Sequence, residues 1–141
     1  MIYNTYSTEE TEMLGASLAE RLDRKNEPRT FIAMRGEMGV GKTAFVRGFA
    51  SFFGIRSVKS PTYTVINEYR GRRQIFHLDT YRIESEDDLY SIGFEDYLAR
   101  DGIIICEWSE NIADFIPSGA ITVSISRNGE SGRIIEITEE L

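Results

Sequence analysis

A glycine-rich stretch, GEMGVGKT, occupies residues 36–43 of the chain. It matches the pattern G-x-x-x-x-G-K-[ST], whose glycines let consecutive backbone N–H groups turn inward around phosphate oxygens. The apolar run FIAM at residues 31–34 precedes the stretch, and residues 43–53 have a helical pattern that Gly54 ends. A strand, a glycine loop and a helix in this order predict a phosphate-binding loop. A glycine-rich turn before an ordinary helix is the alternative.

Each part of such a loop has a chemical role. The lysine, here Lys42, reaches the β and γ phosphates, and the threonine hydroxyl, here Thr43, binds Mg²⁺. The backbone of the loop and the start of the helix contribute N–H groups. We therefore assign the whole loop to nucleotide binding: Gly36, Glu37, Met38, Gly39, Val40, Gly41, Lys42 and Thr43.

A phosphate-binding loop also needs a carboxylate on a neighbouring strand for its metal, and the chain offers two. Asp79 ends the apolar run IFHL at residues 75–78, and Glu107 ends the run IIIC at residues 103–106. We expect both strands to adjoin the loop strand and to end at the same edge of the sheet, near Thr43. An acid at a strand end can simply face water, but two such ends beside a phosphate loop favour a functional role.

Two residue types that each occur once lie in these runs. His77 shares a strand face with Asp79, because side chains alternate along a strand. A packed, hydrogen-bonded histidine is the favoured interpretation, and a general base is the alternative. Cys106 is the only cysteine, so no internal disulfide can form, and its place after three isoleucines predicts a buried apolar role.

The rest of the chain alternates predicted helices and strands. A capping box, STEE, opens a helix over residues 8–24. Glycine-containing turns predict hairpins over residues 64–79 and 121–138, and a helical stretch from Ser85 is interrupted at Gly93. At 141 residues the chain is long enough for one sizeable core and too short for two, so we expect a single domain over residues 1–141.

Net charge and hydropathy limit which partners and which cellular location are expected. The net charge of −7, from 23 acidic and 16 basic side chains, disfavours a large nucleic-acid surface. If an RNA is involved, we expect a partner to hold it. The N-terminus lacks a basic, apolar leader, and no apolar run approaches the roughly 18 residues of a membrane span. A cytoplasmic protein without membrane association is therefore expected.

The reaction is less constrained than the binding of phosphate. The Asn-Lys-x-Asp guanine reader of GTPases is missing, so ATP is favoured over GTP. The chain after Thr43 shows no obvious arginine-rich lid of the kind that small-molecule kinases carry. The residues alone leave a small P-loop ATPase or a kinase, with a nucleotide-dependent adaptor as the competing binding class.

Four segments, in this order, carry a family resemblance: GEMGVGKTAFVRGF, VKSPTYTVINEY, FHLDTYRIES and CEWSE. Together they resemble the TsaE family, also called YjeE, the bacterial P-loop ATPases of the tRNA threonylcarbamoyladenosine pathway. The resemblance implies an α/β, P-loop NTPase-like three-layer fold with a mixed parallel/antiparallel central sheet. It also implies Mg²⁺-dependent ATP hydrolysis and binding to the TsaB and TsaD proteins, with tRNA contacted only indirectly. Because no arginine finger is evident in the chain, hydrolysis should be slow without partners.

The resemblance supports the residues already singled out. The family's magnesium and nucleotide positions fall on Lys42, Thr43, Asp79 and Glu107. The expected metal ligands are therefore Thr43, Asp79 and Glu107, and the expected catalytic residues are Lys42, Asp79 and Glu107.

Four further positions take a role only from the resemblance. Thr62 lies in a switch-like segment and is expected to face the γ-phosphate, while Thr11 and Arg133 fall where the family contacts the adenine end. Trp108 follows Glu107 as in the family's Glu-Trp pair. An aromatic that fills a strand-end pocket and a residue of the active site or partner contact are equal alternatives for Trp108.

Overall fold

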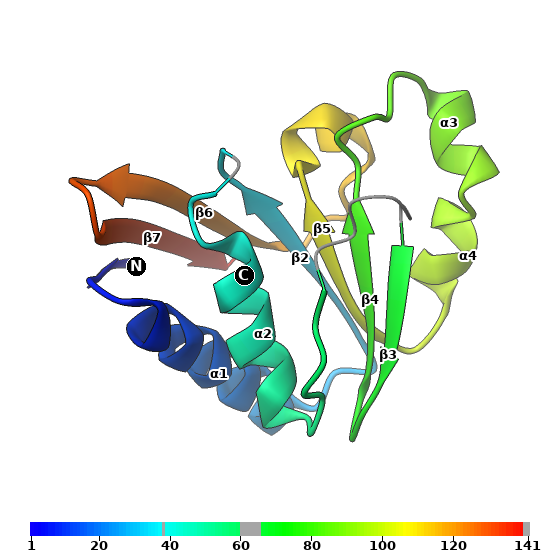
Figure 1. The fold of residues 1–141 in the computed structure, drawn as a ribbon. Helices are drawn as coiled ribbons and strands as arrows, with labels where there is room; N and C mark the ends of the chain where they lie inside the picture. Colours follow the sequence, from blue (N-terminus) through cyan, green and yellow to red (C-terminus); the bar gives the residue numbers. More distant parts are fainter. Residues whose placement is uncertain (38, 60–65, 140–141) are drawn as a thin grey trace.

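The strand before the glycine loop, β2 (Arg29–Arg35), is the central strand of a seven-stranded sheet (Figure 1). The computed structural model describes residues 1–37, 39–59 and 66–139. The strand order is β1-β7-β6-β2-β5-β4-β3. The other elements, in chain order, are β1 (Ile2–Thr5), α1 (Thr8–Lys25), α2 (Lys42–Phe52), β3 (Ile66–Arg70), β4 (Gln74–Asp79), α3 (Glu86–Ser91), α4 (Phe94–Ala99), β5 (Gly102–Glu107), the 3₁₀ helix η1 (Ser109–Phe115), β6 (Ile121–Asn128) and β7 (Gly132–Glu139).

The centre of the sheet is parallel and its outer strands are antiparallel. Strand β2 pairs in parallel with β5 and β6, and β4 pairs in parallel with β5. The pairs β3 with β4, β6 with β7, and β1 with β7 are antiparallel. The predicted α/β fold with a mixed sheet is therefore confirmed.

One expectation about the sheet is wrong. The strand that ends at Asp79, β4, does not adjoin β2, because β5 lies between them. Strand β6 occupies the other side of β2, so β2 has room for only one of the two strands that end in an acid. The two acids still end parallel strands, and Asp79 is the register partner of Glu107.

Apolar side chains cover both faces of the sheet, because neighbouring residues of a strand point to opposite faces. On one face, Ile32 and Ile105 pack with residues of α1 and α2, including Leu18 and Phe45. The other face packs beneath α3, α4 and η1. Its buried residues include Phe31, Phe76, Leu89, Phe94, Ile104 and Ile112. The result is a three-layer arrangement of helices, sheet and helices.

Local signals place the first helix as predicted. The Ser7 hydroxyl accepts a hydrogen bond from the Glu10 N–H at 3.1 Å, and the Glu10 carboxylate accepts one from the Tyr6 N–H at 2.9 Å. This is the capping box in structural form. The helix ends at Asn26, whose left-handed φ of 53° suits an asparagine C-cap, so α1 matches the predicted 8–24 to within one residue.

Sequence reasoning missed two elements, β1 and η1. Strand β1 is a four-residue edge strand that pairs with β7. Ile2, Tyr3 and Thr5 are residue types that favour strands, so a weak signal for it was present in the sequence. The first residues of the predicted 64–79 hairpin lie outside the described residues, and the rest forms β3 and β4 as predicted. Among the described residues, no helix is long and apolar enough to cross a membrane.

Candidate active site

The glycine loop joins the carboxyl end of β2 to the amino end of α2. Gly36 has a φ of 150°, and a Cβ there would lie 2.7 Å from the Ile125 carbonyl oxygen, so the backbone needs glycine at this point. Gly41 is the N-cap of α2 with a φ of 107°, and no side chain caps the helix. The first N–H groups of α2 therefore remain for another acceptor, as a phosphate site requires. Met38 lies outside the described residues.

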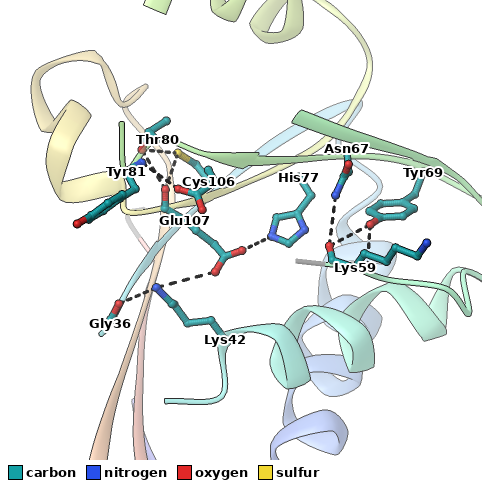
Figure 2. Close-up of polar contacts among 11 residues, drawn as sticks. Gly36, Lys42, Lys59, Asn67, Tyr69, His77, Thr80, Tyr81, Cys106 and Glu107 are labelled. Atoms are coloured by element: carbon teal, nitrogen blue, oxygen red, sulfur yellow. Dashed lines mark hydrogen bonds and ion pairs between the residues drawn. The ribbon is translucent and has the colours of Figure 1, made fainter. Parts of the chain in front are cut away.

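Lys42 is the first residue of α2 and points back over the loop (Figure 2). Its Nζ donates to the Gly36 carbonyl oxygen at 2.7 Å and lies 4.4 Å from the centroid of the Trp108 ring. The residue is only 6% exposed. A buried ammonium needs polar partners, and a carbonyl, an aromatic face and a nearby carboxylate surround this one. The arrangement holds a cation within the loop, where a phosphate would lie.

The two acids lie side by side at the carboxyl ends of β4 and β5. Glu107 is buried, with Oε1 3.9 Å from Lys42 Nζ, whereas Asp79 is half-buried. Burial raises the pKa of the Asp79 carboxyl above its usual range. The hydrogen bond that it accepts from the Tyr81 N–H at 2.9 Å opposes this shift, and the charge of Glu107 adds to it. Two carboxylates of unequal exposure therefore meet beside the loop.

This donor set fits a magnesium ion that comes with a nucleotide. Within residues 1–37, 39–59 and 66–139, no three His, Cys, Asp or Glu side chains gather as an all-protein metal site would require. Magnesium bound with phosphates needs only one or two carboxylates, and the rest of its shell is phosphate and water. Asp79, Glu107 and the half-buried Thr43 at the start of α2 can supply the protein share.

His77 is fully buried on the same face of β4 as Asp79. Its Nε2 lies 2.5 Å from Glu107 Oε2, across the boundary between β4 and β5. The packed, hydrogen-bonded histidine favoured from the sequence is confirmed. Its partner could not be predicted, because the contact depends on the pairing of β4 with β5, and residues 80–101 separate these two strands in the sequence.

A turn after β5 presents Trp108 to the site. Trp108 has a left-handed φ of 59°, which is strained for an aromatic residue, and its ring packs 4.8 Å from that of Tyr81. The Thr80 hydroxyl lies 2.9 Å from the carbonyl oxygens of both Glu107 and Trp108, to which it donates in a bifurcated hydrogen bond. The Ser109 hydroxyl donates to the Met34 carbonyl at 3.1 Å. These two hydroxyls connect the turn to the end of β4 and to β2 through hydrogen bonds. Neither hydroxyl was identified from the sequence.

A second part of the candidate site lies on the far side of the loop. The Arg133 guanidinium donates from Nε to the Val40 carbonyl at 2.7 Å, and Thr11 is buried with its hydroxyl 2.8 Å from that of Thr5. Arg133 and Thr11 are therefore brought together although they are far apart in the sequence. They line a hollow of about 70 Å³ with Ser7, Thr8, Val40, Gly41, Ala44 and Ser131. The predicted contact residue Thr62 lies outside the described residues.

A larger cleft, of about 460 Å³, lies at the opposite edge of the sheet. Its lining includes Arg29, Gly102 and Ile121, the first residues of β2, β5 and β6. None of the residues that the sequence assigned to the site borders it. Chemistry, rather than cavity size, therefore places the candidate site at the glycine loop.

A glycine loop of this pattern, placed between the central strand and a helix of a mixed sheet, defines an α/β protein of the P-loop type. Comparison with known families then places the chain in one of them. The profile described as "Threonylcarbamoyl adenosine biosynthesis protein TsaE" matches residues 5–135. The chain therefore belongs to the TsaE family.

Individual relatives support the assignment. Three proteins named "tRNA threonylcarbamoyladenosine biosynthesis protein TsaE" are similar to this chain. The one from Bacillus subtilis (strain 168) is 33% identical over 138 residues, covering 96% of this chain and 84% of that protein. Those from Haemophilus influenzae and Nostoc sp. are 36% and 38% identical, covering 85% and 92% of this chain and 79% and 80% of those proteins.

A solved structure has the same fold. The crystal structure of Bacillus subtilis YdiB superposes with a TM-score of 0.81 and 28% sequence identity. The match covers 99% of this chain and 84% of that one.

Proposed function

We propose that this chain is a Mg²⁺-dependent ATPase subunit of the bacterial machinery that makes tRNA N6-threonylcarbamoyladenosine, t6A37. It works in the cytoplasm, where its ATP hydrolysis supports turnover of a transferase complex of TsaB and TsaD. The observation that carries the proposal is the buried row of His77, Glu107 and Lys42 at the glycine loop of a TsaE family member (Figure 2).

The loop geometry supports ATP as the ligand. The backbone of residues 36–43 and the uncapped start of α2 would bind the phosphates, with Lys42 directed at the β and γ phosphates. The hollow beside Val40 would receive the adenine end, where Thr11 and Arg133 lie. Met38 and Thr62 keep the roles assigned from the sequence, in the loop and beside the γ-phosphate.

The two acids and Thr43 would hold the magnesium ion, which when bound supplies charge neutralisation at the phosphate oxygens. Glu107 accepts a hydrogen bond from the attacking water and orients it. The water oxygen forms a bond to the γ-phosphorus as the bond from phosphorus to the bridging oxygen breaks, giving ADP and phosphate. The water proton passes to Glu107 and then to solvent. Lys42 stabilises the negative charge that develops on the transferred group.

Radiolabelled γ-phosphate tests the reaction type. ATP labelled at the γ position is incubated with the protein, Mg²⁺, purified TsaB and TsaD, and a small-molecule extract that supplies acceptor metabolites. The expected result is free phosphate, with faster release when the partners are present. Label on a metabolite would indicate a kinase, and label that stays on ATP would indicate an adaptor.

A pull-down tests the partners. Tagged protein is mixed with TsaB and TsaD, with and without ATP and Mg²⁺. Capture of both proteins, with a yield that depends on the nucleotide, is the expected result. Phosphate release without any capture would leave a P-loop ATPase with a different partner.

A further inference from the structure

We propose that His77 is a positioning residue that holds one oxygen of the Glu107 carboxylate, so that Glu107 acts toward the nucleotide through its other oxygen alone. This inference rests on the proposed ATPase function and deepens it. It gives a role to His77, which has no part in the proposed reaction itself.

The contact between the two side chains is close and shielded from water. His77 on β4 is the register partner of Ile105 on β5. Glu107 follows Ile105 by two residues, so its side chain lies on the same face of the sheet as His77. The Nε2 to Oε2 distance is 2.5 Å. His77 is 0% exposed and Glu107 is 5% exposed, so bulk water cannot compete effectively for the contact between Nε2 and Oε2.

The hydrogen-bonding capacity of the ring fixes its role. The proposed role toward water needs Glu107 as a carboxylate, which only accepts hydrogen bonds, and in that state the Nε2 of His77 carries the hydrogen that Glu107 Oε2 accepts. The other ring nitrogen, Nδ1, is buried without a partner among the described residues. An apolar side chain would suit a fully buried position better than a ring with one unpaired nitrogen. Packing alone therefore does not explain His77, whereas its bond to Glu107 does.

The bond leaves the two oxygens of Glu107 with different surroundings (Figure 2). His77 occupies Oε2, and Oε1 points toward the loop, 3.9 Å from Lys42 Nζ. That separation is longer than a hydrogen bond, and the hydrogen bond that Lys42 does donate goes to the Gly36 carbonyl. Oε1 is thus the oxygen directed at the phosphate end of the loop, where it can accept a hydrogen bond from the attacking water.

Fixing one oxygen matters because a carboxylate on a glutamate side chain can rotate. A rotation would turn Oε1 away from the water and would leave the nucleotide contacts of the loop unchanged. Loss of His77 should therefore slow the chemical step much more than it weakens ATP binding.

Two substitutions at this position separate positioning from packing. His77→Leu removes the donor and keeps an apolar side chain, and His77→Gln keeps an N–H donor at a similar reach. Ile75→Val is the matched control, because Ile75 is also fully buried on the same face of β4. Each variant is measured for kcat by phosphate release, for affinity toward a non-hydrolysable ATP analogue by calorimetry, and for melting temperature.

The expected result is a split between rate and affinity. His77→Leu should lower kcat about 10- to 100-fold, the usual cost of losing a residue that orients a ligand group. Its affinity for the analogue should change by less than about threefold. His77→Gln should recover most of the rate, and Ile75→Val should keep the wild-type kcat. In a Glu107→Gln background, His77→Leu should add less than about a twofold loss, because the two residues act as one unit.

Other outcomes would overturn the inference. An unchanged kcat in His77→Leu would show that Glu107 acts without the hydrogen bond from His77. Parallel losses of kcat, affinity and melting temperature that His77→Gln does not restore would assign His77 to packing. A wild-type protein that releases no phosphate, alone or with TsaB and TsaD, would instead overturn the proposed ATPase and this inference with it.

Discussion

Among single residues, the candidate site is distinguished by ionisable side chains that are buried in the folded protein. Lys42 and Glu107 are both almost fully buried, and His77 is completely so. Burial of such groups is costly unless each finds a partner, and each does so through a residue on a different element. Removing one of these side chains leaves its partner buried without a counterpart, so the folding of each variant should be checked by its melting temperature.

Lys42→Ala should abolish hydrolysis and weaken ATP binding by about 10- to 100-fold, the worth of a charge-assisted hydrogen bond. The matched control is Lys25→Ala, which removes a half-exposed lysine at the end of α1. Calorimetric titration with ATP and Mg²⁺, together with phosphate release, measures both effects. Normal turnover in Lys42→Ala would contradict the phosphate-loop assignment.

Glu107→Ala should reduce hydrolysis more than it reduces ATP binding. The reason is that Lys42 and the loop backbone still hold the phosphates, whereas the water loses the group that orients it. Rates should fall by about 10²- to 10⁴-fold. Phosphate release and calorimetry on the same sample separate the two quantities, and an equal loss of both would assign Glu107 to ground-state binding.

At the scale of elements, the position of α2 depends on its close contact with α1. Gly48 of α2 and Gly15 of α1 lie at this contact, where an added Cβ would overlap the backbone of Glu12 and of Phe45 respectively. Because α2 begins at the glycine loop, this contact also sets the position of Lys42. The helix pair thus links core packing to the site.

Gly48→Ala should lower the free energy of unfolding by about 1–3 kcal/mol, because the overlap exceeds the gain in helix propensity. Ser17→Ala, at an exposed position of α1, is the control and should change it by less than about 0.5 kcal/mol. Urea denaturation followed by circular dichroism measures both variants. Gly48→Ala of wild-type stability would show that the helices can move apart without cost.

A carboxylate at the end of β7 joins α1 to the sheet. Glu139 accepts a hydrogen bond from Lys25 at 2.9 Å and lies 3.2 Å from Arg21. The bond from Lys25, then the charges of Lys25 and Arg21, hold the pKa of Glu139 below its ordinary value of 4.5. A lowered folded-state pKa stabilises the fold above 4.5, and this stabilisation is lost as the pH falls through the folded-state value.

Glu139→Gln should therefore lower stability by about 0.5–1 kcal/mol at neutral pH and low salt, as expected for a small ion-pair network. The difference from wild type should vanish once the pH is below the folded-state pKa of Glu139. Denaturation curves collected across this acidic range test the sign. A difference that grows toward acid would contradict the ion-pair assignment.

At the scale of the whole molecule, charge argues against direct binding of RNA. The net charge is −7, and the densest basic group lies at the β3–β4 turn. There the Arg72 guanidinium lies 4.8 Å from the centroid of the Phe52 ring, and Arg73 donates to the carbonyl oxygens of Glu27 and Pro28. These arginines bind the protein itself, which reduces their availability to phosphates.

The isolated chain should therefore not bind tRNA with useful affinity, since phosphate contacts dominate such binding. Labelled tRNA is titrated with the protein at physiological salt, with the complex of TsaB and TsaD as the positive control. Saturable binding at micromolar concentrations or tighter, which weakens steeply with added salt, would place this subunit on the RNA surface.

The parts of the protein that depend on neighbouring residues could be predicted from the sequence alone. The capping box and helical spacing predicted α1, and the glycine pattern predicted the loop between β2 and α2. The turns of the two hairpins predicted β3 with β4 and β6 with β7. In each case, the interactions that set the conformation lie within one helical turn or one hairpin, so a short stretch of sequence contains them.

Contacts between residues that are distant in the sequence became known from the folded structure. It placed β5 between β2 and β4, added β1 as an edge strand, and brought His77 to Glu107 and Arg133 to the loop. The physical reason is that a strand satisfies its backbone hydrogen bonds with another strand, whose identity and register depend on the packing of the whole sheet. A shift of one residue in the pairing of β4 with β5 would turn His77 away from Glu107, although the sequence would be unchanged.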